Sequence, residues 1–187
     1  MALSEDTRPY GLKDCKVKLW TAGALGAAVD LPVANTFKFK EAESSAEFEG
    51  DDRLVGIGAH LTHVEWELEA DGISMAALAV IAGGTVTDSG TTPTQKKRYV
   101  NPVGNERPYF LIEGQAISES GGDLHARVYK CKCKDVDPGG AEKSGRKTSY
   151  KGVGVAVTSA EATAVGGSAA VDECYDFVKN EGIVAIS

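Results

Sequence analysis

Two cysteines separated by a single residue, Cys131 and Cys133, are the first candidates for chemistry in this chain. Their segment alternates like a strand, so both thiols would lie on one face. A structural zinc site usually takes four ligands at recurring spacings. Cys15 and Cys174 stand far away in the sequence and lack that paired spacing. The sequence therefore predicts small, semi-buried thiols, without a metal or another cofactor. It also predicts no disulfides, because thiols made in the cytoplasm stay reduced.

Two histidines, His60 and His63, have the separation of a ligand pair on a helix. Their surroundings alternate as a strand does, and residues three apart on a strand point to opposite faces. A paired-ligand role is therefore not expected. The third histidine, His125, lies alone on another strand, and no order or spacing selects a Cys–His catalytic dyad.

The stretch Gly140-Ala-Glu-Lys-Ser-Gly-Arg-Lys-Thr148 is close to a phosphate-binding loop. That motif needs a lysine directly after the second glycine and then a helix. Here Arg146 intervenes and a strand pattern follows, so we expect no nucleotide binding. One interpretation is a solvated basic loop. The other is a basic contact loop that meets an acidic surface of another subunit, formed by Lys143, Arg146, Lys147 and Lys151.

Adjacent carboxylates such as Glu47 and Glu49, or Asp51 and Asp52, suggest a hydrolase. A general acid needs an apolar pocket that raises its pKa, and these residues lie in a polar, turn-forming stretch. The sequence therefore predicts no enzyme. The chain is acidic, with a net charge of −7 and a pI of about 5.0, and has no basic face with interleaved aromatics. Specific nucleic-acid recognition is not expected either.

The negative charge is concentrated between Glu41 and Asp71, which hold ten acids and one base. This segment could be a solvated face that keeps the protein soluble, or an acidic end that meets another subunit. Two groups of residues are candidates. The first is a contact loop of Glu43, Glu47, Glu49, Asp51, Asp52 and Arg53. The second is a row of carboxylates on one strand face, Glu65, Glu67 and Glu69.

The elements that would position these residues are mostly strands, since the chain has 22 glycines and one convincing helix. The helix, Met75–Ala82, is preceded by two candidate caps, Asp71 and Ser74, and is stopped by two glycines. Alternation or continuous apolar runs predict the strands. These strands are Asp14–Trp20, Thr36–Glu41, His60–Asp71, Tyr109–Ser118, His125–Lys134 and Ser149–Ser159, with a short one at Gln95–Val100.

The remaining segments predict connections around a single domain of residues 1–187. Residues 1–11 form an N-terminal arm, and residues 21–34 form a loop or a poor helix. The segments 85–94, 101–108 and 135–147 are turn-rich or loops. The C-terminal extension, 160–187, is either a final hairpin of 172–178 with 181–186 or a tail packed on a neighbour. No run of about 20 apolar residues predicts a membrane span, and no signal peptide is visible at the N-terminus.

The order of these elements over Leu12–Thr158 resembles the major tail tube proteins of long-tailed bacteriophages. The closest local matches are Ser45-Ala-Glu-Phe-Glu-Gly-Asp-Asp52 and the helix start Asp71-Gly-Ile-Ser-Met-Ala-Ala-Leu78. The resemblance implies a β-sandwich or flattened barrel with one flanking α-helix and a long acidic β-hairpin. It further implies hexameric rings, joined through their sheets into a β-barrel, that stack into a tube for DNA delivery.

The same resemblance implies a location in the virion tail, assembly in the host cytoplasm, and tape measure, tail terminator and tail tip proteins as partners. DNA would pass without specific binding. The acidic loop would make inter-ring contacts, and Glu65, Glu67 and Glu69 would face the lumen as an acidic wall, or else the outside of the tube. Two alternatives stand beside this interpretation: a tube protein of type VI secretion systems, and a monomeric β-sandwich binding module, for example one for carbohydrate. An aromatic content of 7% argues against the second.

Overall fold

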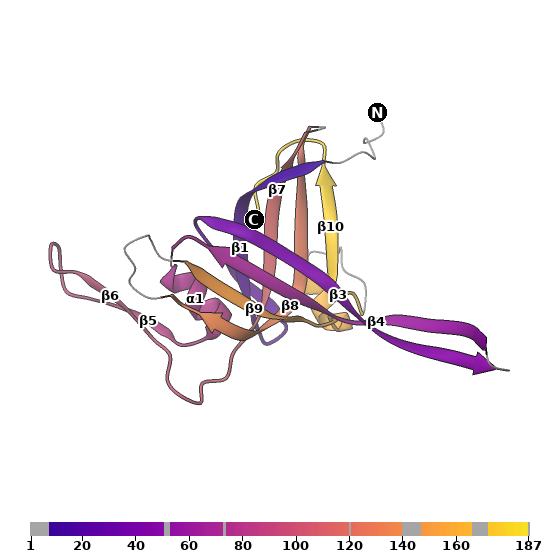
Figure 1. Ribbon diagram of the computed structural model, residues 1–187. Coiled ribbons are helices and arrows are strands. Elements are labelled where there is room, and N and C mark those ends of the chain that lie inside the picture. The colour runs from indigo at the N-terminus through magenta and orange to yellow at the C-terminus, as the bar shows by residue number, and fades with distance from the viewer. Residues whose placement is uncertain are drawn as a thin grey trace.

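The fold is mainly β, with ten strands and two short helices in the part of the chain that the structure describes (Figure 1). The computed structural model describes residues 8–50, 53–72, 74–119, 121–139, 147–165 and 172–186. The strands are β1 (Pro9–Thr21), β2 (Ala24–Asp30), β3 (Ala34–Gly50), β4 (Arg53–Ala70), β5 (Thr85–Ser89), β6 (Lys96–Val100), β7 (Tyr109–Ser118), β8 (Asp123–Asp137), β9 (Thr148–Gly154) and β10 (Tyr175–Asn180). The helices are α1 (Met75–Ala82) and α2 (Ser159–Ala164).

Eight strands form one antiparallel sheet with the order β2-β1-β7-β8-β9-β4-β3, and β10 adds to β8. Strand β8 pairs with β7 on one side and, on the other, with β10 along its first half and β9 along its second. The sheet therefore divides at β8 into two halves. These halves face each other, because Trp66 of β4 packs edge-on against Phe110 of β7, with ring centroids 5.6 Å apart.

The main core lies between the two halves and is closed at one end by α1. Strand β4 supplies alternate side chains to it, since Val64, Trp66 and Leu68 are buried while Glu65 and Glu69 are exposed. This is the alternation predicted for the segment. The predicted helix Met75–Ala82 is also confirmed, with Ser74 as its N-cap: the amide of Ala77 donates to the Ser74 hydroxyl at 3.2 Å.

Strand β7 is buried on both faces, as its continuous apolar run predicts. One face joins the main core through Phe110 and Ile112. The other face forms a second cluster, in which Leu111 and Tyr129 pack against residues of and around α2. Further along this second face, the polar residues of β7 and β8 lie beneath the C-terminal segment 181–186.

Five expectations for the strand ends and connections are wrong. The segment 85–94, expected to be turn-rich, begins with β5, which pairs with β6. Residues 21–34 contain β2, because Ala22 and Gly23, both with positive φ, turn the chain back onto β1. Strand β1 already begins at Pro9, inside the expected arm. The strand expected to reach residue 159 ends at Gly154, and α2 follows. The expected final hairpin does not form, because β10 pairs with β8 and residues 181–186 are not a strand.

Two antiparallel ribbons leave the body at opposite ends of the molecule (Figure 1). The first is the distal part of β3 and β4, where the two strands pair only with each other, since β9 pairs with β4 only from Val64 to Ala70. The acidic loop expected at residues 43–53 is therefore largely a continuation of this β-ladder. The second ribbon is the β5–β6 hairpin.

Candidate functional site

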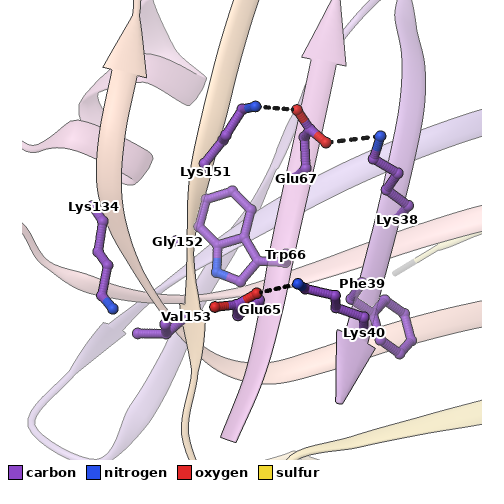
Figure 2. A pocket seen from close by; sticks show the side chains of 10 residues that line it. All are labelled: Lys38, Phe39, Lys40, Glu65, Trp66, Glu67, Lys134, Lys151, Gly152 and Val153. Carbon is purple, nitrogen blue, oxygen red and sulfur yellow. Dashed lines mark ion pairs between the residues drawn. The ribbon is translucent and has the colours of Figure 1, made fainter. Parts of the chain in front are cut away.

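The outer face of β3, β4 and β9 carries a ladder of alternating charges across the strands (Figure 2). Glu67 lies between two lysines: its carboxylate oxygens are 2.8 Å from Nζ of Lys38 and 2.6 Å from Nζ of Lys151. The carboxylate of Glu65 is 2.8 Å from Nζ of Lys40. Antiparallel register produces these contacts, because directly opposed residues share a face and lie close together.

These ion pairs lower the pKa values of both carboxylates. Hydrogen bonds from Lys151 and Lys38 lower the pKa of Glu67 to about 2. The hydrogen bond from Lys40 lowers the pKa of Glu65, and in return raises that of Lys40. Both glutamates therefore stay charged over the physiological range. The pairs are solvent-exposed, so salt screens them and their contribution to stability is small.

The face is charge-balanced rather than acidic. Lys134 also lies beside Val153 and Glu65 at this face, without an ion pair among the described residues (Figure 2). Four lysines thus accompany the three carboxylates of the row, and they line a shallow hollow of about 380 Å³ with Glu65 and Glu67. The negative charges of Glu65 and Glu67 are therefore balanced by lysines within this face, and the expected lumen-facing position of the row stays a prediction.

The residues of the expected acidic contact loop lie on the β3–β4 ribbon as far as the structure describes them. Glu43 and Glu47 are exposed and lie opposite Leu61 and Ile57 of β4. An acidic row and an apolar row therefore share one side of the ribbon. The backbone of Glu49 and Arg53 belongs to the same ladder. Asp51 and Asp52 lie outside the described residues.

On the opposite side of the ribbon, the ring of Phe48 lies over two glycines of β4. A methyl group added at Gly56 or Gly58 would lie 3.9 or 3.5 Å from this ring. The ring remains 60% exposed. The ribbon therefore presents apolar surface on both sides, which is unusual for a hairpin that has only water around it.

The basic contact loop is only partly described. Lys143 and Arg146 lie outside the described residues. Lys147 is exposed and lines a small hollow with the acidic residues Glu69, Asp71 and Asp137. Lys151 lies within β9 and pairs with Glu67, so it belongs to the charged face instead.

The cysteines and histidines form no metal-ligand cluster in the part of the chain that is described. All four thiols are free and buried. Burial raises the pKa of Cys15 to about 12 and that of Cys133 to about 11, so both stay protonated. A bulge leaves Thr62 unpaired, and His60 and His63 therefore lie opposite Ser44 and Ala42, which share one side of β3. The expectation of opposite faces is wrong for this reason.

A buried polar cluster that the sequence reasoning missed lies between β7 and β8. His125 contacts two carboxylates: its Nδ1 is 2.9 Å from Glu113 and its Nε2 is 3.2 Å from Asp123. Gln115 and Asn180 each donate an amide hydrogen to Asp123. Alternating polar residues on both strands were the available signal, but alternation alone does not reveal that a later segment covers them.

That covering segment is held through its backbone. The amide of Val184 donates to Asp123 at 2.9 Å, and its carbonyl accepts from Gln115 at 2.8 Å. Lys16 donates to the carbonyl of Ile186 at 2.8 Å, and the Ile186 side chain is buried. Burial opposes ionisation of Asp123, but its four hydrogen-bond donors outweigh burial and lower its pKa to about 2. The cluster therefore has a structural role: its described polar groups form hydrogen bonds within the chain, and these bonds hold the segment 181–186 on β7 and β8.

No protein-family model and no curated protein matches this chain. None of the helices described is long and apolar enough to cross a membrane.

Proposed function

We propose that this protein is a structural subunit that forms hexameric rings, and that these rings stack into a tube of the phage-tail type through which DNA passes. One observation carries the proposal: the β3–β4 ribbon projects from the body and exposes Phe48 and Ile57, each 60% exposed. A two-stranded ribbon is marginally stable alone in water. Docking of the ribbon on another subunit would bury the apolar side chains near its tip and stabilise it.

Unpaired strand edges support ring formation. In the described part of the chain, β2, β3 and β10 each pair with a single strand, so each offers a row of backbone donors and acceptors. Such edges promote strand addition, and natural proteins usually protect them. Closure of subunits into a ring through these edges satisfies their hydrogen bonds without uncontrolled aggregation.

The charge-balanced face of β3, β4 and β9 is suited to the channel wall. Lysines that neutralise phosphates would hold DNA by releasing counterions. Three of the four lysines at this face are already paired with Glu65 or Glu67. DNA would therefore meet a polar wall with little net charge, against which it can move.

Replacement of residues 44–58 by a short Gly-Ser turn tests the proposal. The far-UV circular dichroism and the melting temperature should stay close to those of the wild type, because the described side chains of this stretch are outside the core. The wild type should form rings or tubes with a central hole in negative-stain micrographs, and the variant should form rings that do not stack. Discrete wild-type monomers at high concentration would contradict the proposal, and so would normal tubes of the variant.

A further inference from the structure

The two projecting ribbons differ in charge as well as in position. In the sequence, the stretch from Glu43 to Arg53, which runs from β3 into β4, holds five acids and one base, a net charge of −4. Residues 85–100, which form the β5–β6 hairpin and its turn, hold three bases and one acid, a net charge of +2. Figure 1 shows the ribbons at opposite ends of the molecule, so they do not meet within one copy.

The basic hairpin has one side that faces solvent and one that is tied to the body. Tyr99 ties it down, because its hydroxyl donates to the carbonyl of Gly83 at 2.7 Å. Lys97 shares the side of Tyr99 and is 3.7 Å from Asp88. Lys96 and Arg98 point to the other side by strand alternation, are exposed, and have no ion pair among the described residues.

The solvent side of this hairpin is also chemically suited to the ribbon. Lys96, Arg98 and Val100 lie opposite the hydroxyl residues Ser89, Thr87 and Thr85 of β5. Val100 is 37% exposed. A basic row with an apolar end thus faces outward, while the β3–β4 ribbon presents Glu43 and Glu47 beside Ile57 and Leu61.

We propose that the side of the β3–β4 ribbon with Glu43 and Glu47 docks on the β5–β6 hairpin of a second copy, beside Lys96 and Arg98. This inference rests on the proposed function, for which it names the inter-ring partner. The contact joins two different surfaces, so the joined pair keeps a free hairpin on the first copy and a free ribbon on the second. Such a contact repeats along an axis without closing, as stacking requires.

Charge reversal on each surface provides the test. One variant carries E43K and E47K, and the other carries K96E and R98E. Each variant alone should fail to form tubes in sedimentation and negative-stain assays, because like charges oppose each other at every contact. An equimolar mixture should assemble again: the reversed ribbon of one variant meets the reversed hairpin of the other, and the two unchanged surfaces also match. Added salt should weaken wild-type stacking.

Two controls separate this inference from the proposed function. Lys13→Glu changes an exposed lysine away from both ribbons and should leave assembly unchanged. Lys147→Glu tests the basic contact loop as the rival partner. If the wild type forms tubes and the K96E/R98E variant does so equally well, the ribbon docks elsewhere, and the proposed function stands without this inference. The same conclusion follows if only Lys147→Glu blocks stacking. A wild type that stays monomeric overturns both.

Discussion

His125 is the residue whose protonation is most directly coupled to the fold. Burial disfavours its charged form, but hydrogen bonds with Glu113 and Asp123 outweigh burial and raise its pKa. Both ring nitrogens face acceptors, and Nε2 is also 3.0 Å from the carbonyl of Val184. Only the doubly protonated ring can donate to both sides. Two further cations lie near Glu113: Lys18 at 3.9 Å, and Arg127, which lies opposite Glu113 in the β7–β8 register and pairs with Asp176.

This coupling predicts a pH dependence of stability. Because the pKa of His125 is higher in the folded state, its contribution is fully present below about 6.5 and is lost as the pH rises through the raised value. Hydrogen bonds to charged groups contribute roughly 2 kcal/mol. In urea unfolding at several pH values, the free energy by which the wild type exceeds His125→Gln should therefore be largest at pH 5–6 and fall at alkaline pH.

Titration of Asp123 does not interfere with this measurement. The pKa of Asp123 is lowered to about 2, so its own contribution is present above the unfolded value and is lost only as the pH falls toward 2. A difference between wild type and His125→Gln that is constant from pH 5 to pH 9 would contradict this prediction, because it would show that folding does not shift the pKa of His125. A difference that rises with pH would show that the imidazole is neutral in the fold.

At the scale of the element, β9 shows how closely two strands can approach. The alternate glycines of this strand indicate close packing from sequence, and the structure supplies the neighbours. A Cβ at Gly152 would lie 2.2 Å from the carbonyl oxygen of Lys132 and 2.6 Å from the ring of Trp66. Backbone on one side and a buried indole on the other leave no room for a methyl group.

Gly152→Ala should therefore destabilise the protein by roughly 1–3 kcal/mol, the range for overpacked cores, in urea unfolding. Gly58→Ala is the matched control, because Gly58 is also a strand glycine and its added Cβ would make only ordinary contact, 3.5 Å from Phe48. This control should unfold close to the wild type. Equal midpoints for the two variants would mean that β9 can shift away from β8 without loss.

Sequence reasoning succeeds for elements whose signal is local. The alternation of β4, the continuous apolar run of β7 and the cap and stop of α1 all lie within the segments themselves. It fails for β2, which is a strand because β1 provides a partner. It also fails for the partner of β10, which pairs with β8 and not with residues 181–186. The helix α2 did have a local signal, the capping box of Thr158 and Glu161, hidden by the alanine- and glycine-rich stretch that follows.

The candidate surfaces also have one part that is predictable from local sequence and one part that depends on strand pairing. The row Glu65, Glu67 and Glu69 follows from strand period alone. Its neutralisation by Lys38, Lys40 and Lys151 does not, because those pairs depend on the register of β4 with β3 and β9. Bulges alter that register, as the unpaired Thr62 shows for the two histidines. Pairing across strands is therefore the part of the site that the sequence alone could not supply.

At the scale of the whole molecule, the two ribbons and the charged face of β3, β4 and β9 lie on different sides of the body. The ribbons project at the two ends of the body, and the charged face lies on the strands between them. In a stacked tube, ribbons that meet along the axis leave this face parallel to the axis, either toward the channel or toward the outside. The assignment of this face to the channel wall requires the first orientation.

Amine labelling of assembled tubes distinguishes the two orientations. Lys40 is 76% exposed and Lys38 is 64% exposed in the single chain, so both should react readily before assembly. In tubes, a small amine-reactive ester should still reach them through the open ends, whereas the same ester attached to a large polymer should not, because the polymer cannot enter the channel. Mass spectrometry of the digested protein gives the modification at each lysine. Polymer labelling of Lys40 at the same rate in tubes as in unassembled protein would place this face on the outside and would assign the channel wall to other strands.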